Sequence, residues 1–368
     1  MTKENLHENY ISEAIKGFDY SSFQTEVSWQ SPSNIALVKY WGKHGNQLPN
    51  NPSISFTLSQ SRTETKVNVT AKGNITNSFS FLFEGKEAPE FGKKVQQYLH
   101  SLSCYFPFVH ELAFAIESRN TFPHSSGIAS SASSMSALAA CLLDIENQMF
   151  GKESGNINLK KASYIARLGS GSAARSVFPY ASEWGKTNAL HESCNEFALP
   201  LANSLHPVYQ NYQDSILLIH SGVKAVSSRA GHVLMETNPF ADARYQQANH
   251  NTSELLNVLK TGDLDAFIRI TEAEAMQLHA LMMVSEPSFI LIQPNTLAAI
   301  AAIHDYRKQT GIPLCFTLDA GPNIHLLYPE SYRKDVLHFI QHELLLFCNQ
   351  QQWIDDRLGL GTSKIVTF

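Results

Sequence analysis

The sequence predicts an α+β protein of two domains, in which mixed or antiparallel sheets are packed with helices. The first observation is length, because 368 residues exceed what one ordinary hydrophobic core accommodates. The second is the alternation of polar and apolar residues in segments such as 63–71, which is typical of half-buried strands. The third is that the first half of the chain mixes these strands, expected in a largely antiparallel sheet, with helical patterns, which is an α+β pattern.

Residues 1–25 are expected to form an N-terminal extension with one short amphipathic helix. Its apolar residues at near-helical spacing are Leu6, Tyr10, Ile11, Ala14, Ile15 and Phe18. The first domain is then expected over 26–205. Its predicted strands are 63–71, 79–83 and 111–118, and its predicted helices are 90–102, 130–146 and 159–168.

The second domain is expected over 206–368, because breakers around residue 206 precede a new strand at 215–220. Its predicted helices are 226–236, 242–260, 263–281, 295–309 and 331–350. The segment 314–328 reads as two strands joined by a Gly-Pro turn, and 364–368 reads as a closing strand that could join either domain.

Composition limits the function classes. Apolar residues make up 43% of the chain and charged residues 17%, with a formal net charge of −5, so we expect a globular protein without a nucleic-acid partner. No run of about 18 apolar residues and no signal-peptide pattern is present, so no membrane association is expected. The five cysteines are dispersed and never form C-x-x-C, which predicts a reducing, cytoplasmic location.

The stretch FPHSSGIASSASS, residues 122–134, suits phosphate binding. A proline, a glycine and several serines lead into a helix, and the N–H groups of a helix N-terminus attract anions. The alternative is an ordinary loop before a serine-capped helix. No lysine follows the glycine, so the stretch is not a Walker P-loop.

Three further stretches carry charged residues in unusual settings. In KYWGK, residues 39–43, Lys39 and Lys43 would share one face of a strand, either as a solvated pair or toward an anionic substrate. In GSGSAARS, Arg175 ends a run of small residues and is either a surface charge in a flexible loop or a bidentate ligand for an anion. In LDAGPN, Asp319 either starts a turn or acts as a catalytic carboxylate. None of the 15 histidines belongs to a metal-binding motif, so no protein metal site is expected.

Together and in this order, SNIALVKYWGK, FPHSSGIASS, ARLGSGSAARSVF and FTLDAGPN closely resemble the diphosphomevalonate decarboxylase family of the GHMP kinase superfamily. The resemblance covers roughly residues 28–368. It implies a two-domain GHMP kinase-like fold with a cleft between the domains, a cytoplasmic enzyme, and a homodimer.

The resemblance also implies the roles of individual residues. Asp319, Arg175 and Lys39 match the catalytic positions. The positions implied for substrate binding are Tyr40, Trp41, Gly42, Lys43, Ser170, Gly171, Ser172, Ala173, Ala174 and Ser228. Those implied for the nucleotide phosphates are Pro123, Gly127, Ser130, Ser131 and Ser133.

The implied reaction is the decarboxylation of (R)-5-diphosphomevalonate with ATP and Mg²⁺, giving isopentenyl diphosphate, ADP, phosphate and CO₂. The sequence departs from the family pattern at His44, Gly45, Pro52, residues 124–126 and Arg229. These departures leave open an alternative, a superfamily kinase or decarboxylase acting on mevalonate or 5-phosphomevalonate.

Overall fold

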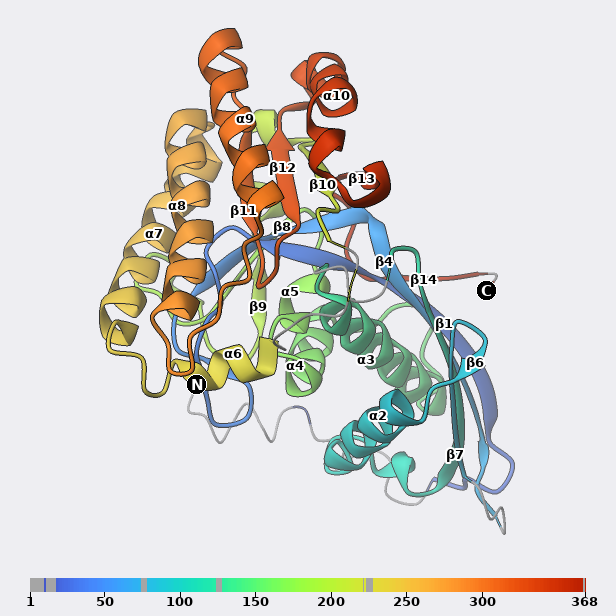
Figure 1. Cartoon of the computed structure of the whole chain (residues 1–368). Helices are drawn as coiled ribbons and strands as arrows, with labels where there is room; N and C mark the ends of the chain where they lie inside the picture. Colours follow the sequence, from blue (N-terminus) through green and yellow to red (C-terminus); the bar gives the residue numbers. More distant parts are fainter. Residues whose placement is uncertain are drawn as a thin grey trace.

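A computed structural model describes residues 10, 18–73, 78–123, 128–220, 222, 228–366 and 368. Two large sheets with helices packed on them, and a two-stranded ribbon of β2 (Lys43–His44) and β3 (Leu48–Pro49), make up this part of the chain (Figure 1). The two-domain α+β architecture expected from the sequence is confirmed. The expected N-terminal helix lies outside the described residues apart from Tyr10 and Phe18; the Tyr10 ring is buried and packs on Tyr164, with ring centroids 4.9 Å apart.

The first sheet is mixed and has the order β14-β1-β4-β7-β5-β6, with β8 and β9 attached to one end of β4. Its strands are β1 (Gln24–Ala36), β4 (Ser53–Ala71), β5 (Phe79–Phe83), β6 (Lys86–Glu87), β7 (Leu112–Asn120), β8 (Ala181–Trp184), β9 (Ala198–Pro200) and β14 (Ser363–Lys364). Only the β5–β7 pair is parallel among these described strands. The predicted strands 63–71, 79–83 and 111–118 all lie in this sheet.

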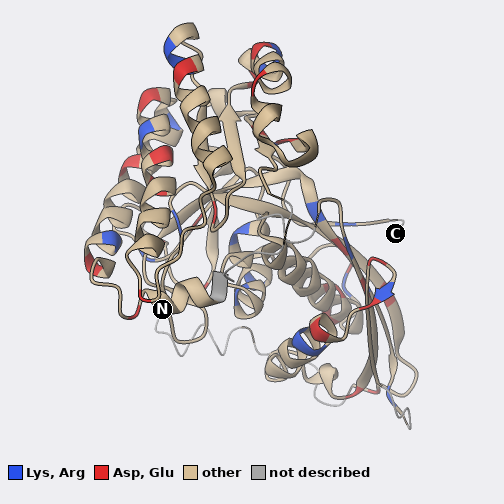
Figure 2. Ribbon diagram, viewed as in Figure 1, with Lys and Arg blue, Asp and Glu red and all other residues tan. Residues whose placement is uncertain are grey.

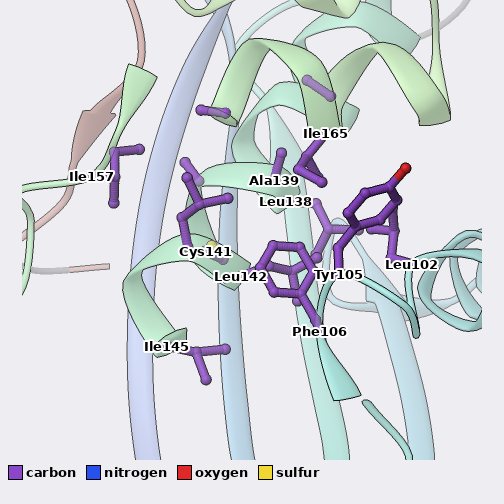
Figure 3. Close-up of a cluster of buried hydrophobic side chains, with 14 of the residues drawn as sticks. Leu102, Tyr105, Phe106, Leu138, Ala139, Cys141, Leu142, Ile145, Ile157 and Ile165 are labelled. Atoms are coloured by element: carbon purple, nitrogen blue, oxygen red, sulfur yellow. The ribbon is translucent and has the colours of Figure 1, made fainter. Parts of the chain in front are cut away.

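Helix α3 (Ser130–Met149) packs against β1 and β4 and contributes a large group of side chains to the first core. The neighbouring helices are α2 (Pro89–Ser101), α4 (Leu159–Gly169) and the short α5 (Ala173–Ser176). Figure 3 shows side chains of α3, such as Leu138 and Leu142, beside Phe106 and Ile165. Because α3 is apolar along several faces, it is buried between the sheet and α4 rather than lying on the surface.

The second sheet is antiparallel, with the order β11-β12-β10-β13. Its strands are β10 (Gln213–Leu217), β11 (Cys315–Leu318), β12 (Ile324–Tyr328) and β13 (Trp353–Arg357). The helices of this part of the chain are α6 (Ser228–Leu234), α7 (Ala241–Thr261), α8 (Leu264–Met283), α9 (Pro294–Thr310) and α10 (Arg333–His342). In Figure 1, α6 lies away from this sheet, near α4. The chain changes from one sheet to the other between β9 and β10; the domain boundary at 206 stays a prediction.

Two predictions about the C-terminal part need correction. The helix expected over 331–350 ends at His342, because Glu343 leaves helical geometry with φ −123° and ψ −47°, and 3₁₀ turns follow. The closing strand is also shorter than 364–368: it is Ser363–Lys364, and it pairs with β1 of the first sheet.

The surface carries charges of both signs along the outer helices, as Figure 2 shows for α7, α8 and α9. Among the described residues, none of the helices combines the length and the apolar character needed to cross a bilayer. All five cysteines are free thiols. The described residues also contain no cluster of three or more His, Cys, Asp or Glu side chains that could hold a metal ion.

Candidate active site

Lys39 lies just after β1, where the chain leaves the first sheet and meets helices α7 and α8 of the second. Its side chain is fully buried, and Nζ donates a hydrogen bond to the Ala36 carbonyl at 2.5 Å. The expectation that Lys39 and Lys43 share one strand face is wrong, because β1 ends at Ala36 and Lys43 begins the separate short strand β2 (Lys43–His44). The buried position excludes the solvated lysine pair as an interpretation of Lys39.

Arg175 is also buried, in α5, so it is neither a surface charge nor part of a flexible loop. Its Nη1 donates to Ser53 Oγ at 2.9 Å, and Nε and Nη2 donate to Asn34 Oδ1 at 3.4 and 3.3 Å. Each Nη atom carries a second N–H, so the held guanidinium keeps donors for a planar anion. The ring of Trp184 lies 5.7 Å from the guanidinium carbon.

Asp319 follows β11 at the start of the turn that leads into β12. Its carbonyl accepts hydrogen bonds from Gly321 N at 2.7 Å and from His279 Nε2 at 3.1 Å. The backbone is therefore held independently of the carboxylate. The side chain is half-buried, which allows it to meet a ligand.

The three predicted catalytic residues interact electrostatically, although they come from different sheets. Burial lowers the pKa of Lys39 to about 8, and the negative charge of Asp319 opposes that shift. Burial also lowers the pKa of Arg175 to about 10, again opposed by Asp319. Two buried cations therefore interact electrostatically with one carboxylate, an arrangement suited to a substrate that carries several negative charges.

The remainder of KYWGK forms a loop, and its two aromatic side chains contact His232 of α6. The ring centroids of Tyr40 and Trp41 lie 4.2 and 5.0 Å from that of His232, whose Nδ1 accepts the Gly42 N–H at 3.0 Å. Gly42 has φ +92°, and a Cβ there would lie 2.2 Å from Tyr245 Oη. Both the turn and the close approach thus require glycine.

The small residues of 170–174 are also placed beside Tyr40. A Cβ on Gly171 would lie 2.7 Å from Tyr40 Oη and 2.9 Å from Trp184. Ala173 and Ala174 are fully buried. Ser170 Oγ lies 3.5 Å from Ser172 Oγ and 3.3 Å from Ser131 Oγ. The hydroxyl group of Ser170 therefore lies next to the start of α3.

The start of α3 lacks the serine cap that was the alternative interpretation. The N-cap residue is Ala129, and no side chain caps the helix. Ser131 is exposed, and Ser130 Oγ accepts a hydrogen bond from Asn120. Ser133, in contrast, is fully buried, and its hydroxyl lies 2.6 Å from Thr63 Oγ1 of β4 and donates to the Ser130 carbonyl of α3 at 3.1 Å.

Some predicted site residues are not placed with their side chains. Gly127 lies outside the described residues. Ser228 begins α6, and its side chain lies outside what the structure describes. Pro123 is exposed and follows β7. Lys43 Nζ donates a hydrogen bond to Gln47 Oε1 at 3.0 Å.

The sequence did not predict the residues that hydrogen-bond to the predicted site residues and fix their positions. Asn34 and Ser53 hold Arg175, His232 holds the Gly42 N–H, and Glu274 accepts the Lys39 N–H at 2.8 Å. Asn34 stands inside a stretch already singled out, so its position offered a signal. The contact of Glu274 joins residues 235 apart in sequence, and no local pattern could have found it.

Two family models together match most of this chain. Residues 31–195 match the diphosphomevalonate decarboxylase-like N-terminal domain, and residues 215–362 match the mevalonate 5-diphosphate decarboxylase C-terminal domain. Diphosphomevalonate decarboxylase of Ganoderma lucidum is 29% identical over 87% of this chain and 82% of its own length. The human enzyme is 26% identical over 81% of this chain and 75% of its own length.

Solved structures give the same result. A structure described as MDDEF in complex with MVAPP, AMPPCP and magnesium is 30% identical, with a TM-score of 0.79 over 94% of this chain and 100% of its own. Mevalonate diphosphate decarboxylase of Staphylococcus aureus is 27% identical, with a TM-score of 0.79 over 93% of this chain and 98% of its own. The chain belongs to the diphosphomevalonate decarboxylase family.

Proposed function

We propose that this chain decarboxylates (R)-5-diphosphomevalonate with ATP and Mg²⁺, forming isopentenyl diphosphate, ADP, phosphate and CO₂. The observation that carries the proposal is the pair of buried cations, Lys39 and Arg175, which both interact electrostatically with Asp319. A kinase needs a base and charge neutralisation at the phosphoryl group. A decarboxylase also needs a directional hold on a carboxylate, which a guanidinium supplies.

The first step is phosphoryl transfer to the tertiary hydroxyl of the substrate. Asp319 accepts the hydroxyl proton while the oxygen bonds to the γ-phosphorus and ADP leaves. The Lys39 ammonium balances the negative charge of the transferred phosphoryl group. Such steps depend mainly on alignment and charge neutralisation, and buried, hydrogen-bonded side chains provide both without reorganisation.

In the second step, the C–O bond to phosphate breaks and the electrons of the C–C bond to the carboxylate form the new double bond as CO₂ leaves. Arg175 holds the carboxylate so that this bond aligns with the departing phosphate. Asn34 and Ser53 fix the guanidinium plane from behind. The carboxylate of Asp319 stabilises positive charge that develops at the tertiary carbon.

The nucleotide phosphates would lie at the start of α3, beside Ser131 and Ser170. The uncapped helix N-terminus and the exposed Ser131 hydroxyl fit an anion. Mg²⁺ would be held largely by phosphate oxygens, since the described residues contain no metal-ligating cluster. Bound there, it would neutralise phosphate charge. The KYWGK loop, with Tyr40 and Lys43, would hold the diphosphate end of the substrate.

A substrate panel tests the proposed function. Mevalonate, 5-phosphomevalonate and 5-diphosphomevalonate are each incubated with ATP and Mg²⁺, and CO₂ and ADP are measured in parallel. Equal release of both from the diphosphate supports the proposal. ADP release without CO₂, or preference for a substrate with fewer phosphates, would instead identify the superfamily kinase or monophosphate-specific alternative.

The homodimer and the cytoplasmic location are proposals of the same kind. Family membership supports the first, and five free thiols suit a reducing compartment. Analytical ultracentrifugation of the purified chain tests the dimer directly. A species at the 41.0 kDa mass of one chain across micromolar concentrations would argue against it.

A further inference from the structure

A buried ion pair between helices α7 and α8 lies directly behind Lys39. Arg244 Nη1 donates to Glu274 Oε1 at 2.8 Å and Nη2 donates to Oε2 at 2.6 Å, so the pair is bidentate. Both side chains are almost completely buried. Asn251 donates to Glu274 Oε1 at 2.6 Å, and Gln277 accepts from Arg244 at 3.0 Å.

This pair holds the main chain of Lys39 on both sides. Glu274 Oε2 accepts the Lys39 N–H at 2.8 Å, and Arg244 Nη2 donates to the Lys39 carbonyl at 3.1 Å. Asn51 donates to the same carbonyl at 3.0 Å. Since Lys39 lies beyond the end of β1, these side chains replace the partners that a strand ladder would give.

Stability alone gives a poor account of the pair. Removing two charges from water costs several kcal/mol, and well-packed apolar residues often replace such a pair without loss of stability. The arrangement instead joins helices of the second sheet to a residue of the first sheet's active-site loop. The two charges also act on the Lys39 ammonium in opposite senses.

The groups that act electrostatically on Lys39 come from several elements. The carboxylates of Asp319 and Glu274 favour its charged form, while Arg175 and Arg244 disfavour it. Two neighbouring groups also interact with its charge, namely His279 of α8 and Asp214 of β10. Among these, only Arg244 and Glu274 contact the Lys39 main chain in the described structure.

We propose that Arg244 and Glu274 are positioning residues for Lys39, which fix its main chain and balance the charge around its ammonium. This inference rests on the proposed function only in that Lys39 acts there as a cation. Opposite effects on Lys39 follow from removing the two charges. Loss of the Glu274 carboxylate leaves Asp319 as the remaining carboxylate that favours the charged form of Lys39, against Arg175 and Arg244, whereas loss of the Arg244 guanidinium removes one cation that disfavours it.

The direct test is the titration of Lys39 in protein labelled with ¹³C at lysine Cε, with its signal assigned from a Lys39→Met variant. In Glu274→Gln we expect the Lys39 pKa to fall by about one unit, and in Arg244→Gln to rise by a similar amount. The matched control is Glu272→Gln. Glu272 lies on the same helix but pairs with Arg307 at 2.6 Å and His304 at 3.2 Å. The control should leave the Lys39 pKa unchanged.

Steady-state kinetics provides the functional readout. At pH 8, a fall of one unit from a pKa of about 8 reduces the protonated fraction about fivefold, so kcat of Glu274→Gln should fall about fivefold more at pH 8 than at pH 6. The KM values should change little. If Glu274 had only a structural role, Glu274→Gln should lower Tm but leave the alkaline side of the pH profile of kcat unchanged.

The outcomes separate this proposal from the proposed function. If the wild type releases no CO₂, the function fails while the titration still tests the pair. A lower Lys39 pKa in Glu274→Gln and a higher one in Arg244→Gln support the proposal. If only one variant folds, the direction of its pKa shift is the test. Unchanged Lys39 titration in a folded variant, or a shift equal to that of Glu272→Gln, would overturn it.

Discussion

His232 of α6 accepts the backbone N–H of Gly42 through Nδ1 at 3.0 Å, while its ring lies between Tyr40 and Trp41. The relationship joins the second domain's helix to the loop that would hold the substrate diphosphate. Because Nδ1 accepts, the imidazole is neutral in this arrangement, and burial lowers the pKa of His232 to about 3. A proton on Nδ1 would break the contact with Gly42.

We therefore expect His232→Leu to raise KM for 5-diphosphomevalonate severalfold while leaving KM for ATP within about twofold. The change removes an acceptor worth about 1–3 kcal/mol when its donor is left buried and unpaired. Steady-state kinetics with each substrate varied in turn measures the split. Val233→Ala is the control, because Val233 is the next residue on α6 and is 52% exposed. Equal increases in both KM values would contradict a role confined to the substrate loop.

The same relationship predicts how activity depends on pH. Since the pKa of His232 is lowered to about 3, its protonation should contribute nothing to the rate between pH 5 and 8. The pH profile of kcat/KM in His232→Asn, which keeps an acceptor oxygen, should have the same acid limb as the wild type. An acid limb in the wild type that disappears in this variant would show that His232 titrates within the working range.

Asp319→Asn should keep the fold and nucleotide binding but lose most turnover. A neutral amide neither accepts the hydroxyl proton nor stabilises a carbocation, and we expect kcat to fall at least about a hundredfold. The fold should persist because the Asp319 main chain is held by Gly321 and His279. Calorimetric titration with AMPPCP and Mg²⁺ checks nucleotide binding. Near-normal kcat in the folded variant would remove Asp319 from the mechanism.

Local patterns in the sequence predicted strands in both large sheets and singled out Lys39, Arg175 and Asp319 as candidates; their catalytic roles came from the family resemblance and stay a proposal. Alternation identified 63–71 because one face of β4 packs on α3, and Asp319 was found because it lies between an apolar strand and a Gly-Pro turn. The predicted helix 331–350 was too long because apolar spacing does not distinguish an α-helix from the 3₁₀ turns that follow Glu343. The prediction that Lys39 and Lys43 lie on one face of the same strand was wrong because β1 ends at Ala36, before both residues.

The residues that support the site could not be found in this way. His232 meets Gly42 across 190 residues, and Glu274 meets Lys39 across 235. Each is one polar residue on an amphipathic helix, where a polar side chain is ordinary. Only the packing of the two sheets brings them to the active-site loop.

Arg175→Lys should keep the positive charge yet lose the geometry of the site. One ammonium cannot reproduce two parallel N–H···O bonds to a carboxylate while also bonding to Asn34 and Ser53. We expect decarboxylation to fall at least about a hundredfold, or about 3 kcal/mol in barrier, with a modest effect on ATP binding. Arg119→Lys, at a half-exposed ion pair with Glu64, is the control. Activity of Arg175→Lys within about twofold of wild type would exclude the carboxylate role.

The last prediction concerns a hydroxyl group. Tyr40 Oη is buried without a hydrogen-bond partner among the described residues, beside Gly171. An unpaired buried hydroxyl costs about 1–3 kcal/mol, so Tyr40→Phe should raise Tm of the unliganded protein. If the hydroxyl bonds to substrate, the same variant should raise KM for 5-diphosphomevalonate severalfold. Stability and affinity would thus change in opposite directions.

Tyr209→Phe is a matched control for that experiment. Tyr209 Oη is likewise buried and has no partner in the described part of the chain, but its ring packs on Phe56 and Phe267 in the hydrophobic core. This variant should raise Tm by a similar amount and leave KM unchanged. Differential scanning calorimetry and steady-state kinetics on both variants provide the comparison. A higher Tm with unchanged KM in Tyr40→Phe would show that the Tyr40 hydroxyl does not bind the substrate. The only effect of the variant would then be the removal of an unpaired buried hydroxyl.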